Sequence, residues 1–106
     1  MGVKDKVLQR WIEALGPKPA SIERIVLFGS RARGTARPDS DYDLALVVSQ
    51  RDRRLVDRCY DAVVDVLLET GRLVSLKIFT SSEFARLSAM KTPFTQRILA
   101  EGIEIG

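Results

Sequence analysis

The feature that most constrains the fold of this chain is a set of three short apolar runs, each rich in β-branched residues. The runs cover 22–28, 42–48 and 73–79, and each has the length and composition of a buried β-strand. Between the second and third runs, apolar residues recur at helical spacing over 52–70, and Gly71 ends the pattern. Strands that alternate with helices predict a mixed α/β or α+β domain with a small sheet of three or four strands.

Shorter helices and a terminal strand complete the predicted element order. The helical spacing over Val3–Leu15 predicts a first helix with Asp5 on its outer side. Two helix-start patterns and one short apolar run follow the third strand; they are Thr80–Glu83, Thr92–Pro93 and 103–105. We expect the helices to pack mainly on one face of the sheet, and residues 1–106 to form a single domain.

Histidine is absent and Cys59 is the only cysteine, which excludes several kinds of catalytic site. A nucleophile paired with histidine, a disulfide within the chain and a cysteine-rich zinc site are all ruled out. Catalysis must therefore use carboxylates, bound metal ions, Lys, Arg or backbone groups. The single cysteine and the lack of a long apolar run favour a cytoplasmic protein without a membrane segment. Lys and Arg, 17 in all, exceed the 14 Asp and Glu only slightly, so nucleic acid is not an expected partner.

Residues 29–34 directly follow the first predicted strand and suit the binding of an anion. Gly29 lets a phosphate approach the backbone closely, because it has no Cβ. A helical turn that starts at Ser30 presents backbone N–H groups and a hydroxyl to such a phosphate. Arg31 and Arg33 can add charge-assisted contacts to phosphate oxygens. The alternative is a plain strand-to-helix turn with a solvated basic surface, and this segment alone does not separate the two.

Asp41 and Asp43 stand two residues apart at the start of the second predicted strand. Because alternate residues of a strand share a face, both carboxylates project from the same side and repel each other unless a cation lies between them. Hard divalent ions such as Mg²⁺ take carboxylate and phosphate oxygens together. The alternative is a polar loop that enters the strand. Together with the anion-binding turn, however, the pair outlines a site for a nucleoside triphosphate and a metal ion.

The turn at residues 29–34 and the Asp41/Asp43 pair together resemble the sequence pattern of a known family, the minimal nucleotidyltransferases of the DNA polymerase β superfamily. The family pattern is a hydrophobic residue, Gly-Ser, about ten residues, and Asp-x-Asp with hydrophobic flanks, and Phe28-Gly29-Ser30 and Asp41-Tyr42-Asp43-Leu44 match it. The fuller pattern, Gly-Ser-x-Ala-Arg-Gly, five residues and Ser-Asp-x-Asp-Leu, matches at every fixed position, including Ser40. Glu101-Gly102-Ile103 is also similar to the usual ending of the family.

The resemblance implies a polymerase-β-like nucleotidyltransferase fold and the transfer of a nucleotidyl group, in particular AMP, from ATP or another NTP to a hydroxyl. It assigns Mg²⁺ or Mn²⁺ to Asp41 and Asp43. It assigns the phosphates to Gly29, Ser30, Arg31, Arg33 and Ser40. Many members of the family are antitoxins paired with a HEPN-domain toxin, which some of them modify with AMP, so a HEPN-domain partner is expected. The family pattern is also compatible with an oligomer. It does not specify which base of the nucleotide is preferred or which hydroxyl accepts the nucleotidyl group.

One position departs from the family pattern. The family usually supplies a third acidic residue from a neighbouring strand, but 73–79 places Ser75 and Lys77 on the face shared with Asp41 and Asp43. A serine hydroxyl is a poor ligand for Mg²⁺ and no general base at neutral pH, and Lys77 either contacts the site or is solvated. Two hypotheses follow: an active nucleotidyltransferase, or a catalytically weakened nucleotide-binding domain that acts by binding a partner protein.

Overall fold

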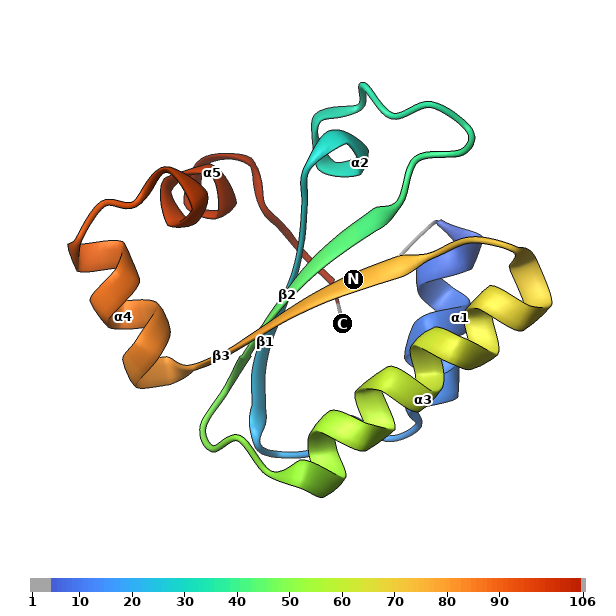
Figure 1. The fold of residues 1–106 in the computed structure, drawn as a ribbon, viewed down its shortest axis with the longest axis horizontal. Coiled ribbons are helices and arrows are strands. Elements are labelled where there is room, and N and C mark those ends of the chain that lie inside the picture. The colour runs from blue at the N-terminus through green and yellow to red at the C-terminus, as the bar shows by residue number, and fades with distance from the viewer. Residues whose placement is uncertain (1–4, 106) are drawn as a thin grey trace.

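The three apolar runs form strands, and a short fourth strand joins them in one mixed sheet (Figure 1). The computed structural model describes residues 5–105. Within that range the elements are α1 (Lys6–Leu15), β1 (Ile22–Phe28), α2 (Ser30–Arg33), β2 (Tyr42–Val48), α3 (Arg53–Thr70), β3 (Val74–Thr80), α4 (Ser81–Ala89), α5 (Pro93–Glu101) and β4 (Ile103–Glu104). The predicted α/β class with a small mixed sheet is therefore confirmed.

The sheet has the strand order β3-β2-β1-β4, so that β2 lies in its interior and β3 at one edge. β1 pairs antiparallel with both β2 and β4, whereas β2 and β3 are parallel. Parallel neighbours need a crossover connection, and α3 supplies it. Every residue of β2 is buried except Asp43, which is half-buried. The interior strand thus carries a carboxylate near its start.

The sheet has an apolar layer on each face, because alternate residues point to opposite sides. One face packs on α1 and α3, where Trp11 and Cys59 are fully buried. The other face packs on Phe84 of α4 and Ile98 of α5, and Figure 1 shows these helices across the sheet from α1 and α3. The two longest helices thus share one face, and α4 and α5 cover part of the other. The helices are therefore divided between the two faces, whereas packing mainly on one face was expected. No helix within residues 5–105 is long and apolar enough to cross a membrane.

The first helix begins later than the periodicity predicts, because Asp5 is its N-cap and not an outward residue within it. Asp5 Oδ1 accepts hydrogen bonds from the backbone N–H groups of Val7 and Leu8, at 2.8 and 3.2 Å. Asp is among the best N-cap residues, since its carboxylate satisfies N–H groups that have no helical acceptor. Positions 3 and 4 of the predicted helix lie outside the described residues.

The later helix starts agree with the sequence signals. Thr80 and Glu83 form a reciprocal capping box at the start of α4, and Thr92 caps α5 with Pro93 in its first turn. β3 begins at Val74, one residue later than predicted. These signals succeed because capping depends on residues only three positions apart.

Gly102→Ala is expected to destabilise the protein by about 1–3 kcal/mol through overpacking. A Cβ at position 102 would lie 2.4 Å from both the Ile98 carbonyl oxygen and Val26 Cγ1, at the point where α5 meets β1. The backbone oxygen cannot move away as a flexible side chain would. Chemical denaturation measures the effect, with Leu99→Ala on the exposed side of α5 as the matched control. Equal stability of the two variants would contradict this account of the α5–β1 junction.

Candidate functional site

The register between β1 and β2 brings Gly29 against Asp43. Phe28, the last residue of β1, is the antiparallel partner of Asp43. Gly29 follows with a φ of 75°, in the left-handed region that glycine adopts without steric cost, and turns the chain into α2. A Cβ at position 29 would lie 2.5 Å from Asp43 Oδ2. Glycine is therefore required here by the backbone conformation and by the carboxylate packed against it.

The carboxylates of Asp41 and Asp43 interact unfavourably with each other. Asp41 is exposed just before β2, and Asp43 is half-buried within the strand. Burial raises the pKa of Asp43 above its ordinary value and the charge of Asp41 raises it further, whereas Lys77 and Arg33 act to lower it. A bound cation would relieve this repulsion, because it favours the charged form of both carboxylates. The pair is therefore chemically suited to a divalent ion with oxygen ligands.

β3 brings Ser75 next to this carboxylate pair. In the parallel ladder Asp43 is the partner of Ser75, and Ala45 is the partner of Lys77, so both β3 residues share the face that carries Asp43. Within residues 5–105 no group of three or more acidic or cysteine side chains is placed to hold a metal ion. The site thus combines two carboxylates, a hydroxyl and an ammonium group.

Arg31 holds the loop that connects α2 to β2. Its Nη2 donates hydrogen bonds to the carbonyl oxygens of Ser40, at 2.8 Å, and of Pro38, at 3.2 Å. The guanidinium also lies over the ring of Tyr42, 4.2 Å from the centroid, in a cation–π arrangement. Tyr42 in turn donates its hydroxyl hydrogen to Asp5 Oδ2 at 2.9 Å. The guanidinium of this predicted phosphate ligand therefore faces the loop and the Tyr42 ring.

Arg33 and Ser40 also have partners within the protein. Arg33 Nη1 lies 3.0 Å from Glu101 Oε2, in an ion pair that joins α2 to the end of α5. Ser40 Oγ accepts a hydrogen bond from the backbone N–H of Arg37 at 2.9 Å. Sequence reasoning missed the roles of Glu101 here and of Asp5 beside Tyr42, because both contacts join distant parts of the chain. An Asp directly before a helical run was the one local signal for Asp5.

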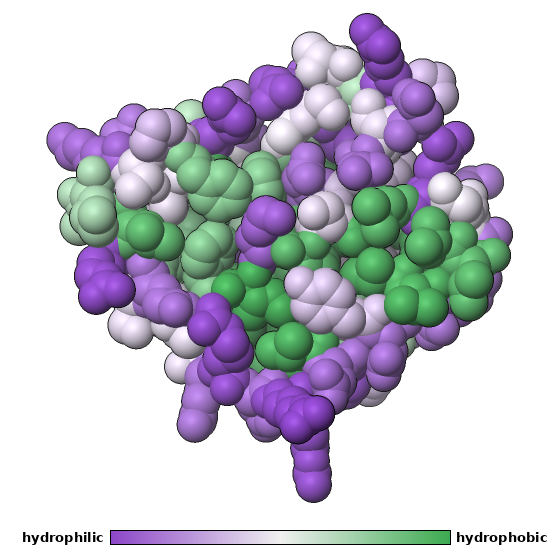
Figure 2. Space-filling view, viewed as in Figure 1, coloured by the Kyte–Doolittle hydropathy of each residue, from purple (hydrophilic) through white to green (hydrophobic). Residues whose placement is uncertain are grey.

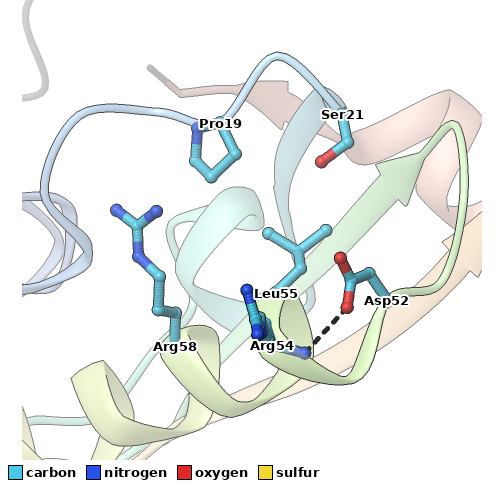
Figure 3. Close-up of a pocket in the computed structure, with 6 residues that line it drawn as sticks. All are labelled: Pro19, Ser21, Asp52, Arg54, Leu55 and Arg58. Atoms are coloured by element: carbon cyan, nitrogen blue, oxygen red, sulfur yellow. Dashed lines mark hydrogen bonds between the residues drawn. The ribbon is translucent and has the colours of Figure 1, made fainter.

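A surface pocket of about 270 Å³ lies at the opposite end of β2 from Asp43 (Figure 3). Arg58 Nη2 on its wall donates to the carbonyl oxygens of Leu15 and Pro17, at 2.5 and 3.2 Å. Asp52 accepts a hydrogen bond from the backbone N–H of Arg54 at 2.9 Å, as the dashed line in Figure 3 marks. The lining residues are Pro19, Ser21, Asp52, Arg54, Leu55 and Arg58. These polar groups hold the start of α3 and the loop before β1, and we assign no ligand to the pocket.

Comparison with known proteins places the Gly29–Asp43 site in context. The family model described as polymerase beta, nucleotidyltransferase, matches residues 11–106, a span that includes the turn and both aspartates. The chain belongs to this nucleotidyltransferase family. A relative in Methanocaldococcus jannaschii, MJ0604, provisionally named a protein adenylyltransferase, is 30% identical over 82 residues, which cover 71% of this chain and 82% of the relative.

Two solved structures share the fold of this nucleotidyltransferase domain. One is described as a toxin-antitoxin with AMP-PNP and matches with a TM-score of 0.53 and 15% sequence identity. The match covers 96% of this chain and 72% of the solved chain. The other is a variant of the toxin-antitoxin MntA-HpeT and matches with a TM-score of 0.54 and 16% sequence identity. The match covers 93% of this chain and 71% of the solved chain. At such identities they establish the fold. The predicted resemblance to nucleotidyltransferases of the DNA polymerase β superfamily is confirmed by the family model.

Proposed function

We propose that this chain transfers AMP from ATP to a hydroxyl group on a partner protein. The observation that carries the proposal is the contact between Gly29 and the Asp43 carboxylate. It joins a turn without a side chain, which a phosphate can approach, to a carboxylate pair that favours a cation. The relative provisionally named a protein adenylyltransferase supports AMP as the transferred group and a protein as the acceptor.

The proposed reaction is an attack of the acceptor oxygen on the α-phosphorus of ATP. The new P–O bond forms as the bond from the α-phosphorus to the bridging oxygen of the β-phosphate breaks, pyrophosphate leaves, and the hydroxyl proton is released to solvent. Bound Mg²⁺ or Mn²⁺ would offset charge on the phosphates, and Asp41 and Asp43 would hold the ion. The backbone of Gly29 and the hydroxyl of Ser30 would hold the β- and γ-phosphates. Lys77 would add positive charge on the same face.

The partner that we propose is a HEPN-domain toxin, with this chain as its antitoxin. The minimal-nucleotidyltransferase resemblance supports this class of partner. The two solved structures that share the fold are toxin–antitoxin assemblies by their descriptions, and one of them contains AMP-PNP. Since that likeness concerns the fold, the acceptor has to be identified by experiment.

Incubation with labelled ATP, Mg²⁺ and the proteins that co-purify with the chain tests this proposal. We expect label on a co-purified protein, and no label with the Asp41→Ala/Asp43→Ala variant. Mg²⁺-dependent binding of ATP without transfer to any co-purified protein would favour the alternative below. Absence of ATP binding would contradict both functions, because both place a nucleotide at the Gly29–Asp43 contact.

The second candidate function is a nucleotide-binding domain that acts by covering a partner protein. The pairing of Asp43 with Ser75 favours it, because a neutral hydroxyl occupies the strand position where we place the third acid of the family. Such a site would retain two carboxylates for one ion and lose much of the capacity for turnover.

Ser75→Asp is expected to raise the rate of AMP transfer by about 10²-fold, the contribution of a well-placed general base. The new carboxylate would lie across the ladder from Asp43, where it can bind a second ion or accept the acceptor proton. The initial rate of label transfer at fixed ATP and Mg²⁺ measures the effect. Ser75→Asn is the matched control, because asparagine has the shape of aspartate without its charge, and this variant is expected to show no gain in rate. A rate for Ser75→Asp no higher than that of Ser75→Asn would refute this role for position 75.

A further inference from the structure

The outer side of α3 exposes a row of apolar side chains. Tyr60, Val64 and Leu68 recur four residues apart and therefore lie one above another on the helix, with Leu67 beside them. Leu73, just before β3, extends the row. The exposed fractions are 45% for Tyr60, 51% for Val64, 41% for Leu67, 79% for Leu68 and 40% for Leu73. We refer to these five residues as the α3 patch.

The interior of the domain does not account for the α3 patch. A different side of the helix faces the sheet and α1, through Leu55, Cys59, Ala62, Val63 and Val66. A surface helix of a globular protein normally has one apolar stripe and a polar opposite side. α3 has a second apolar surface, and on a protein surface such a patch marks an interaction site.

The α3 patch adjoins an open edge of the sheet. β3 is an edge strand, and α3 leads directly into it through the turn at Gly71. Figure 2 shows hydrophobic side chains gathered over α3 and β3, with charged residues around them. The backbone N–H of Tyr42 donates to Leu73 O across the β2–β3 ladder, so the alternate residues Val74, Leu76 and Ile78 direct their backbone groups away from β2. An apolar helix side and an open strand edge thus lie next to each other.

We propose that a second copy of this chain covers the α3 patch, with the two α3 helices antiparallel about a two-fold axis near Val64. Such an axis places Tyr60 of one copy against Leu68 of the other, and Val64 against Val64. The row is therefore complementary to itself, as an interface between identical chains requires.

The charges at the two ends of the patch favour this antiparallel arrangement. Asp57, with a side chain 67% exposed and Arg53 Nε 4.0 Å away, precedes Val64 by about two turns. The half-buried Arg72 follows Val64 at a similar separation, just past the end of the helix. The proposed axis therefore brings Asp57 of each copy toward Arg72 of the other, whereas a parallel arrangement would place Asp57 against Asp57. Opposite charges across the seam set the orientation of the two copies.

The proposed dimer leaves the Gly29–Asp43 site open. Val74 and Leu76 of β3 face α3, whereas Ser75 and Lys77 lie on the opposite face with Asp43. A second copy on the α3 side would therefore not cover the two carboxylates. Self-association is thus independent of the proposed function and compatible with it. A patch of five side chains is at the small end of specific interfaces, so the expected dimer depends on protein concentration.

Disulfide cross-linking tests the position of the axis. Val64→Cys introduces an exposed thiol into a chain whose Cys59 is fully buried. Mild oxidation is expected to link Val64→Cys to a second copy of itself, and to link Tyr60→Cys to Leu68→Cys in a mixture of the two. Leu99→Cys, on the exposed side of α5, is the matched control and is expected to remain unlinked. No cross-linking of the three patch variants, or equal cross-linking of the control, would overturn the proposal.

Light scattering over a range of protein concentrations tests the chemistry of the interface. We expect the unmodified chain to form a dimer as concentration rises, and Leu68→Asp to remain a monomer, because that exposed position contributes nothing to the core. Asp57→Arg and Arg72→Asp are each expected to weaken the dimer, and the double variant to restore it. A monomer at every concentration, or a dimer that Leu68→Asp leaves intact, would overturn the proposal. Neither result would bear on AMP transfer.

Discussion

Asp43→Asn is expected to abolish AMP transfer, with a loss of at least about 10²–10³-fold, the effect of removing a key electrostatic group from an active site. The amide has the shape of the carboxylate but no charge, so with Asp41 it would hold a divalent ion weakly. Transfer of label from ATP to the partner protein measures the loss. Asp61→Asn, on the exposed side of α3, is the matched control and is expected to keep full activity. Full transfer by Asp43→Asn would contradict the proposed metal site.

The same substitution is expected to raise the stability of the ligand-free protein. Burial and the charge of Asp41 raise the pKa of Asp43 in the folded state, so the ionised carboxylate at neutral pH opposes folding, and the neutral amide removes that cost. The gain in melting temperature is therefore expected at neutral pH, and is expected to vanish as pH falls below the unfolded-state pKa. Mg²⁺ with ATP is expected to stabilise the unmodified chain and not the variant. A melting temperature below that of the unmodified chain at neutral pH would contradict this electrostatic account.

The positions of Gly29 and Asp43 along the chain were accessible from local patterns. A strand is recognisable from its own residues, and a glycine at the end of a strand indicates a turn that other residues resist. The contact between the two was not accessible, because it depends on the register that pairs Phe28 with Asp43. Register is a property of two strands, and one sequence segment does not specify it.

The two arginines of the turn illustrate a different limit. Arg31 and Arg33 are suited by residue type both to phosphates and to partners within the protein. The ring of Tyr42 and the carboxylate of Glu101 provide such partners. The spacing of these residues along the sequence does not indicate that they lie close to the turn. The tertiary fold determines which group a guanidinium contacts. Residue type therefore predicted that Arg31 and Arg33 can bind anions, but not which groups they contact.

α3 shows where periodicity itself was misleading. The apolar residues that recur at helical spacing over 52–70 include Leu67, but Leu67 is 41% exposed. The helix is apolar on more than one side, since Tyr60, Val64 and Leu68 continue the stripe outward. When apolar residues extend around a helix, spacing alone does not tell which of them face the core. The excess of apolar positions on α3 is the sequence feature that underlies the interface proposed above.

Gly29→Ala is expected to eliminate transfer as completely as Asp43→Asn does, but to lower stability instead of raising it. An L-residue at a φ of 75° loses roughly 1–2 kcal/mol from crowding of its Cβ. The Cβ would also lie 2.5 Å from Asp43 Oδ2, so the carboxylate would have to leave its position. Label transfer and thermal unfolding of the same variant measure the two effects.

Gly34→Ala separates backbone strain from displacement of the carboxylate. Gly34 has nearly the same φ, 77°, and a Cβ there would meet nothing within 4 Å. Its replacement is therefore expected to lower stability by a similar strain and to leave Mg²⁺-dependent ATP binding and transfer nearly intact. If Gly29→Ala retained as much transfer as Gly34→Ala, the contact with Asp43 would be a packing detail and not part of the site. A selective loss at position 29 would instead show that the turn works only when the carboxylate beside it keeps its place.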